Sequence, residues 1–176
     1  QLFLMYLYSN KKRFYVSDAT KTLPFTPMTL TRAVKQLETT GLFIVTKDGV
    51  NKVIEAKYNN AELFEKAKKF LLNPVRKWGY IDKKDMTSDM IFAGETALSE
   101  RTMLITYAIW NKHFEKTKLT NELIDSERQV RLELWAYDPV LFSNKNTADS
   151  LSVALSFKDT NDERLEVAVE ELIKRE

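Results

Sequence analysis

Apolar residues in the first part of the chain recur at spacings that predict short helices. The apolar segment 2–8 contains no helix breaker, so we expect it to form the end of a buried helix. Because Gln1 already stands inside this apolar stretch, we expect the native start and part of a first helix to precede it. Ser17 can cap a short helix over 18–23, which Pro24 ends.

The most regular pattern predicts a helix over 27–40. Thr26 is placed to cap this helix, Pro27 suits its first position, and Gly41 suits its C-terminal cap. Its apolar positions share one face, at Leu30, Ala33, Val34 and Leu37. The opposite face carries hydroxyl, apolar and cationic groups of the kinds that contact base edges and phosphates, at Met28, Thr29, Thr31, Arg32, Lys35 and Gln36.

A β-hairpin is expected directly after this helix. Segments 42–46 and 52–56 are prone to form strands, and the residues Lys47, Asp48 and Gly49 suit the turn between them. A short helix, a turn, a long amphipathic helix and a hairpin follow one another in a winged helix-turn-helix. In that fold the residues expected to contact DNA are Thr26, Pro27, Met28, Thr29, Thr31, Arg32, Lys35, Gln36, Lys47 and Lys52.

This region resembles a known family over about residues 14 to 58. The recognition helix of MarR-like winged-helix regulators is similar to FTPMTLTRAVKQLETTGLF, from Phe25 to Phe43. Lys47, Asp48 and Lys52 stand where that family often has Arg, Asp and Arg. The resemblance implies binding to double-stranded DNA. Lysines in place of the arginines keep simple charge contacts with phosphates but remove bidentate ones.

The second half of the chain mixes helical and strand patterns. A helix is expected over 59–72, and Asn73-Pro74 ends it. Segment 75–82 is expected to be either the hinge between the domains or the first strand of the second one. Strands are expected over 107–110 and 130–137, and a helix over 94–104. Segment 151–157 fits either a strand or a helix capped by Asp149 or Ser150. The last helix shows capping-box spacing at Thr160 and Glu163.

The strand predicted over 130–137 is expected to be half-buried. Its apolar residues alternate with Arg131, Glu133, Trp135 and Tyr137. Together these patterns predict an α+β fold with a winged helix-turn-helix DNA-binding domain over 1–74 and a small, acidic α+β interaction domain over 75–176.

The second domain also resembles a known group. Regulators related to the AbiEi antitoxins of type IV toxin-antitoxin, or abortive-infection, systems have C-terminal domains similar to AGETALSERTML, ELWAYDPVLFS and LSFKDTNDERLEVAVEELIKR. The resemblance implies an interaction surface for a protein partner such as a toxin.

The charges are distributed unevenly along the chain. Residues 1–80 hold 14 Lys and Arg against 6 Asp and Glu, whereas the other 96 residues hold 13 against 19. A basic first half favours contact with a polyanion, because neutralised phosphates release counterions. The chain has no cysteine, no apolar segment long enough to span a bilayer and no visible signal peptide, so we expect a cytoplasmic protein without disulfides.

The side chains that carry enzyme chemistry are sparse. Six carboxylates are candidate metal ligands, but their spacing does not match a calcium loop. They are Glu127, Glu133, Asp138, Asp159, Asp162 and Glu163. His113 is the only histidine, and the four glycines form no nucleotide-binding loop. Trp78, Trp110 and Trp135 are most simply core or interface anchors. We therefore expect no enzyme activity, no metal site and no cofactor.

These observations favour a homodimeric, sequence-specific regulator of transcription that binds double-stranded DNA and acts as a repressor. The dimer is expected from the apolar first segment and from the two-fold symmetry of operator half-sites. The alternative is an antitoxin-type interaction module that binds a partner toxin and regulates its own operon.

Overall fold

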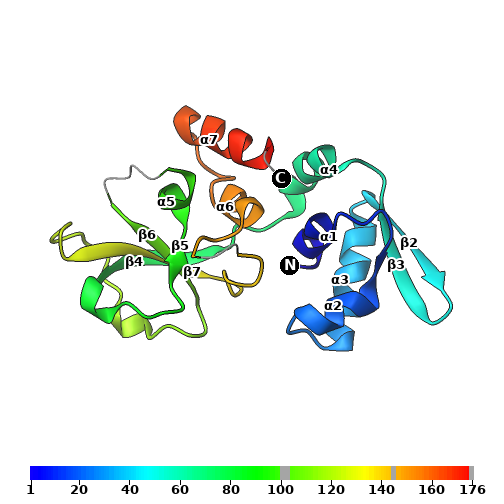
Figure 1. Ribbon diagram of the computed structural model, residues 1–176, viewed down its shortest axis with the longest axis horizontal. Helices are drawn as coiled ribbons and strands as arrows, with labels where there is room; N and C mark the ends of the chain where they lie inside the picture. The colour runs from blue at the N-terminus through cyan, green and yellow to red at the C-terminus, as the bar shows by residue number, and fades with distance from the viewer. Residues whose placement is uncertain (100–103, 144–145, 175–176) are drawn as a thin grey trace. The chain divides into compact units, whose positions relative to one another are not determined.

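The computed structural model describes residues 1–99, 104–143 and 146–174 and has a mixed α+β fold with two sheets. The α+β class is confirmed. The chain divides into two compact units, Gln1–Leu71 and Leu72–Glu176 (Figure 1). They are called the N-terminal and C-terminal units below. The division falls after Leu71, whereas the sequence pattern placed it after residue 74.

The N-terminal unit combines four helices with a small antiparallel sheet. In chain order its elements are α1 (Leu2–Ser9), β1 (Phe14–Tyr15), α2 (Val16–Thr22), α3 (Pro27–Thr39), β2 (Phe43–Asp48), β3 (Asn51–Ala56) and α4 (Asn60–Ala67), followed by a 3-10 turn at Lys68–Phe70. The sheet order is β1-β3-β2, so the central strand pairs with a hairpin partner and with a short strand from before α2.

Helix α1 lies in the core of this unit, which explains why its sequence is apolar on all sides. Leu2, Phe3, Leu4, Tyr6 and Leu7 are all buried. The Tyr6 ring meets the Phe43 ring edge-on, with centroids 5.3 Å apart, and its hydroxyl accepts a hydrogen bond from the Ala56 amide at 2.9 Å. The helix thus ties the end of β3 to the core and fixes the hairpin relative to α3.

The second helix departs from the expected boundaries. Helix α2 begins at Val16, with Tyr15 as its N-cap residue, so the prediction that Ser17 caps it is wrong. Tyr15 is paired with Val53 in the sheet, and this pairing sets where the strand stops and the helix starts. Leu23 is extended in front of Pro24, as the ring of a following proline requires.

The C-terminal unit is a four-stranded mixed sheet with helices on one face (Figure 1). Its elements are β4 (Val75–Asp82), a 3-10 turn at Lys83–Asp85, β5 (Ile91–Phe92), α5 (Gly94–Leu98), β6 (Thr106–Trp110), a 3-10 turn at Lys116–Lys118, β7 (Gln129–Trp135), α6 (Ser150–Ser156) and α7 (Glu163–Lys174). The sheet order is β4-β7-β6-β5. Strand β7 runs antiparallel to β4 and parallel to β6.

Strand β7 is covered on both faces, so the prediction of a half-buried strand is wrong. Leu132 and Leu134 pack in a core cluster on one face. On the other face Trp135 packs with Val153 of α6 and is fully buried, and Glu133 is only 5% exposed. The helices cover the face that the alternating pattern assigned to solvent.

Three further expectations are decided in this unit. Segment 151–157 is mostly helical, because the Asp149 side chain caps α6 by accepting a hydrogen bond from the Ser152 amide at 2.9 Å. Asp162, not Thr160, accepts a side-chain hydrogen bond at the start of α7, so the capping box is wrong. Helix α5 ends at Leu98 because Ser99 is extended, while residues 100–103 of the expected helix lie outside the described residues.

No helix among the described residues is both long enough and apolar enough to cross a membrane.

Candidate nucleic-acid interface

Helix α3 is fixed at its start and along its inner face. The Thr26 hydroxyl accepts a hydrogen bond from the Thr29 amide at 3.2 Å, and Pro27 occupies the first turn, both as predicted. Leu30 and Val34 are 2% and 1% exposed, so they anchor the helix in the core. Gly41 follows the helix with φ of 72°, a conformation that glycine adopts without strain. These contacts therefore fix the orientation of the outer face of α3 within the N-terminal unit.

The outer face of α3 carries the residues of this helix that the sequence pattern predicted to contact DNA. Met28 is 65% exposed, and the other selected residues of this helix are also exposed: Thr29, Thr31, Arg32, Lys35 and Gln36. Met28, Arg32 and Lys35 follow helical spacing and form one stripe. In the described parts of the chain, neither the Arg32 nor the Lys35 side chain forms an ion pair with a carboxylate. Both cations are thus available to an external anion.

The hairpin of β2 and β3 brings two lysines together. Lys47 and Lys52 are direct partners across the two strands, so their side chains leave the same face of the hairpin. Neither forms an ion pair with a described carboxylate. Gly49 turns the chain with φ of 59°, and Val50 at the tip is completely exposed. Like charges directly opposite each other repel, so an anion that binds both lysines relieves an unfavourable contact.

A polar cluster that sequence reasoning missed joins β1 to the hairpin of β2 and β3. The Tyr15 hydroxyl donates to Asp48 Oδ2 at 2.7 Å, and Arg13 Nε lies 3.0 Å from Glu55 Oε1. The hydrogen bond to Asp48 and its negative charge raise the pKa of Tyr15. These contacts join β1 to the hairpin over long sequence separations, so no local pattern could have revealed them. They fix the strands that carry the two lysines.

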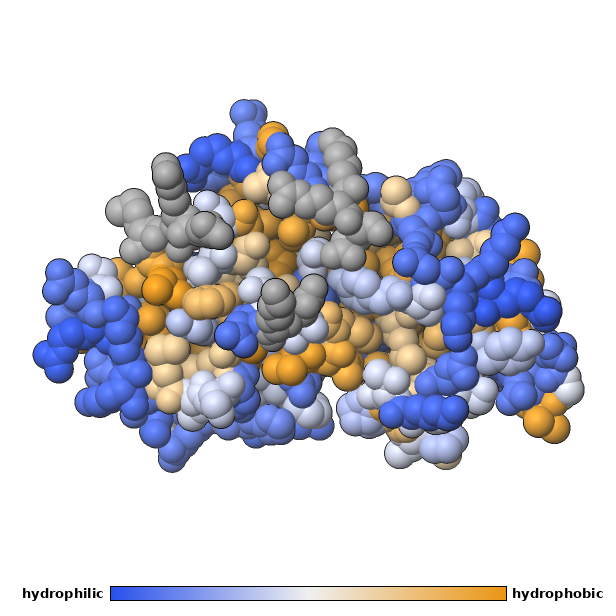
Figure 2. All heavy atoms as spheres, in the orientation of Figure 1, coloured by the Kyte–Doolittle hydropathy of each residue, from blue (hydrophilic) through white to orange (hydrophobic). Residues whose placement is uncertain are grey.

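Charge is unevenly neutralised within the N-terminal unit, which holds twelve Lys and Arg against six Asp and Glu. Lys66 of α4 pairs with Glu62, and Lys68 pairs with Glu65 at 2.7 Å. The cations of α3 and of the hairpin lack such partners among the described residues. Hydrophilic side chains dominate the part of the surface over the β2–β3 hairpin in Figure 2.

The six carboxylates singled out in the C-terminal unit do not converge on one site, although two of them, Glu133 and Asp159, line the same pocket. Glu133 is buried, whereas Asp162 lies at the surface and bonds to Arg164 at 3.0 Å. No three His, Cys, Asp or Glu side chains among the described residues lie close enough to hold a metal ion. His113 is exposed, and its Nδ1 lies 4.0 Å from Asp89 Oδ2.

A polar pocket in the C-terminal unit was also missed by sequence reasoning. It has a volume of about 430 Å³ and is lined by Trp78, Arg131 and Glu133 among others. Trp135 is a core residue as expected, but Trp78 is 45% exposed. The alternating pattern of β7 pointed Arg131 and Glu133 to solvent and so concealed that they share this pocket.

Comparison of the chain with protein-family models, with curated protein sequences and with solved structures yields no match.

Proposed function

We propose that the N-terminal unit is a winged helix-turn-helix and that the protein is a sequence-specific regulator of transcription that binds double-stranded DNA. In this proposal α3 is the recognition helix and the β2–β3 hairpin is the wing. The observation that carries it is the outer face of α3, where exposed hydroxyls stand beside two cations that lack carboxylate partners among the described residues.

The residue types on this face suit the chemistry of the major groove. An arginine such as Arg32 can donate two hydrogen bonds to the O6 and N7 atoms of a guanine, and Thr29 can bond to a base edge. The exposed Met28 can pack against a thymine methyl group. Lys35, Lys47 and Lys52 are suited to phosphates, which position the protein without reading sequence.

In this proposal the protein acts as a repressor and binds a two-fold operator as a homodimer. Two copies of α3 would lie in successive major grooves, about 34 Å apart. Both the dimer and the repressor role belong to this proposal.

The test is a fluorescence anisotropy titration of the full chain on DNA from upstream of its own gene and on random duplex, each at several salt concentrations. We expect the upstream DNA to bind about a thousandfold more tightly at physiological salt, with a steep loss of affinity as salt rises. The control variant is Lys66→Gln on α4. It removes a lysine that already pairs with Glu62, so it should bind both duplexes as the wild type does. Equal affinity for both duplexes would contradict sequence-specific regulation, and no binding would contradict the DNA-binding proposal itself.

A second candidate function is an antitoxin-type module that binds a partner toxin. Leu123 and Ile124 favour it, because they are 43% and 80% exposed and stand between Glu122 and Asp125. An exposed apolar pair flanked by carboxylates suits a basic partner surface. The double variant Leu123→Ser and Ile124→Ser should lose a partner that co-purifies from the native cells but keep DNA affinity. Unchanged co-purification would contradict this surface.

A further inference from the structure

The pocket of the C-terminal unit has the size and the polar groups of a small-molecule site. Its volume of about 430 Å³ lies within the range of roughly 300 to 1,000 Å³ that ligand pockets occupy. It lies beside β4 and β7 and the chain that follows α6. The lining includes three cations, Arg76, Lys77 and Arg131, and three carboxylates, Glu95, Glu133 and Asp159.

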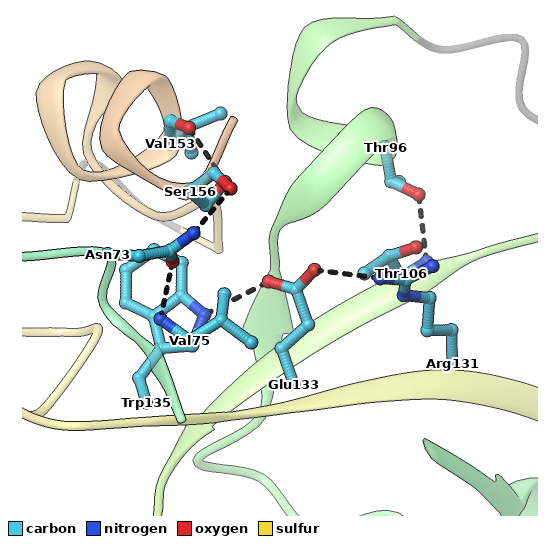
Figure 3. A network of polar contacts seen from close by, with 9 residues as sticks. All are labelled: Asn73, Val75, Thr96, Thr106, Arg131, Glu133, Trp135, Val153 and Ser156. Carbon is cyan, nitrogen blue, oxygen red and sulfur yellow. Dashed lines mark hydrogen bonds and ion pairs between the residues drawn. The ribbon is translucent and has the colours of Figure 1, made fainter. Parts of the chain in front are cut away.

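Glu133 is the buried acceptor of this pocket. Its residue is 5% exposed, and its Oε2 accepts a hydrogen bond from Trp135 Nε1 at 3.0 Å (Figure 3). The other oxygen, Oε1, lies 3.8 Å from Arg131 Nη2, which is too long for a hydrogen bond. A carboxylate can accept about four hydrogen bonds, so Glu133 retains capacity for a cationic donor. Burial raises the pKa of this carboxyl, as expected for an incompletely paired acid.

Arg131 is the corresponding donor. Its guanidinium lies over the ring of Trp78, 4.2 Å from the ring centroid, and its side chain is 34% exposed. Its Nε is buried and has no hydrogen-bond partner among the described residues. A buried donor without an acceptor is unfavourable. Because Nε itself is buried, a ligand carboxylate would bind at the Nη groups, which can donate charge-assisted hydrogen bonds from the part of the side chain that lines the pocket.

Gly94 allows the start of α5 to pack closely against the Glu133 side chain. A Cβ atom at Gly94 would lie 3.2 Å from Glu133 Oε1 and 2.8 Å from Thr106 Cγ2. The start of α5 therefore approaches the side chains of β6 and β7 more closely than any residue with a side chain permits. The Thr106 amide also bonds to the Thr96 hydroxyl at 2.9 Å, which ties α5 to β6 (Figure 3).

We propose that this pocket binds a small zwitterion of the amino-acid class, with the ligand ammonium at Glu133 and the ligand carboxylate at Arg131. The side chain of the ligand lies along Trp78 and Leu165, which also line the pocket. The equal numbers of cations and carboxylates favour a ligand that carries both charges. A polyanion such as DNA would gain little net attraction there, because the three carboxylates offset the three cations. This inference does not rest on the proposed function, because binding is measured without DNA.

The first experiment titrates the full chain with each of the common L-amino acids at up to millimolar concentration. Isothermal calorimetry reports binding, and tryptophan fluorescence reports the environment of Trp78. For an amino acid that binds, we expect the corresponding amide and N-acetyl derivative, each of which lacks one charge, to bind about tenfold more weakly or worse. Absence of binding by every amino acid would overturn the proposal, as would equal binding of the derivatives.

The second experiment locates the ligand. Glu133→Gln and Arg131→Gln should each weaken binding about tenfold or more, while the neighbouring surface variants Glu127→Gln and Arg128→Gln should bind as the wild type does. Trp78→Phe should lose most of the fluorescence response but keep the calorimetric signal. Full affinity in folded Arg131→Gln protein would overturn the assignment. The derivatives test the wild-type chain, so the proposal stays testable even if a variant does not fold.

Discussion

Gly94→Ala should destabilise the C-terminal unit through two separate effects. Gly94 has φ of 53°, a left-handed conformation that costs a residue with a side chain about 1 to 2 kcal/mol. The added Cβ would also lie 2.8 Å from Thr106 Cγ2, in a buried position where overpacking costs about 1 to 3 kcal/mol. We therefore expect a loss of about 2 to 5 kcal/mol in the free energy of unfolding. For a domain of this size that lowers the melting temperature by roughly 10 °C or more.

Tryptophan fluorescence during urea unfolding measures this effect selectively, because Trp78, Trp110 and Trp135 all belong to the C-terminal unit. Gly49→Ala is the matched control. Gly49 has φ of 59°, but a Cβ there would meet nothing within 4 Å, and the glycine belongs to the other unit. Its fluorescence midpoint should equal that of the wild type. A midpoint for Gly94→Ala within error of the wild type would refute the close approach of α5 to β6 and β7.

Three further predictions concern the interface, the assembly and the buried acid. Thr29→Ala and Arg32→Ala should weaken binding to specific DNA more than to random DNA, whereas Lys35→Ala and Lys52→Ala should weaken both alike; equal losses for all four would contradict base reading. Sedimentation of the full-length protein at tens of micromolar should show a dimer, and a strict monomer would count against it. The pKa of Glu133 is raised from its ordinary 4.5 by burial, so its contribution to stability is present below about pH 4.5 and is lost as the pH rises through the raised pKa. Glu133→Gln should therefore raise the free energy of unfolding at neutral pH relative to the wild type, with a gain that shrinks toward pH 4; a constant gain would contradict this.

Local signals in the sequence predicted the elements whose ends depend on nearby residues. Thr26, Pro27 and Gly41 define α3 through contacts within a few residues, so its start and its glycine end were predictable. Asp149 also caps α6 through a local contact, although the sequence pattern of segment 151–157 fitted either a helix or a strand. The prediction failed where tertiary packing decides, as at Ser17, where pairing of Tyr15 with Val53 sets the start of α2.

The candidate sites differ in the same way. The exposed face of α3 follows directly from helical spacing, so its residues could be named from the sequence. The hairpin cluster joins Tyr15 to Asp48, and the pocket joins Trp78 to Arg131. Both contacts depend on strand pairing between distant segments, which periodicity cannot reveal. The contacts of α3 with DNA remain a prediction.

Directed DNA cleavage tests the central claim most directly, since the chain has no cysteine that could compete for a thiol reagent. Met28→Cys places a single thiol on the outer face of α3, and Glu65→Cys places one on α4 as an exposed control. Each variant, carrying an iron chelate on its thiol, is bound to the tightest duplex selected from a random library. The account predicts that the Met28→Cys conjugate cuts both strands beside one major groove in each half-site, while the Glu65→Cys conjugate cuts weakly. Equal cleavage by the two conjugates would contradict a recognition role for α3.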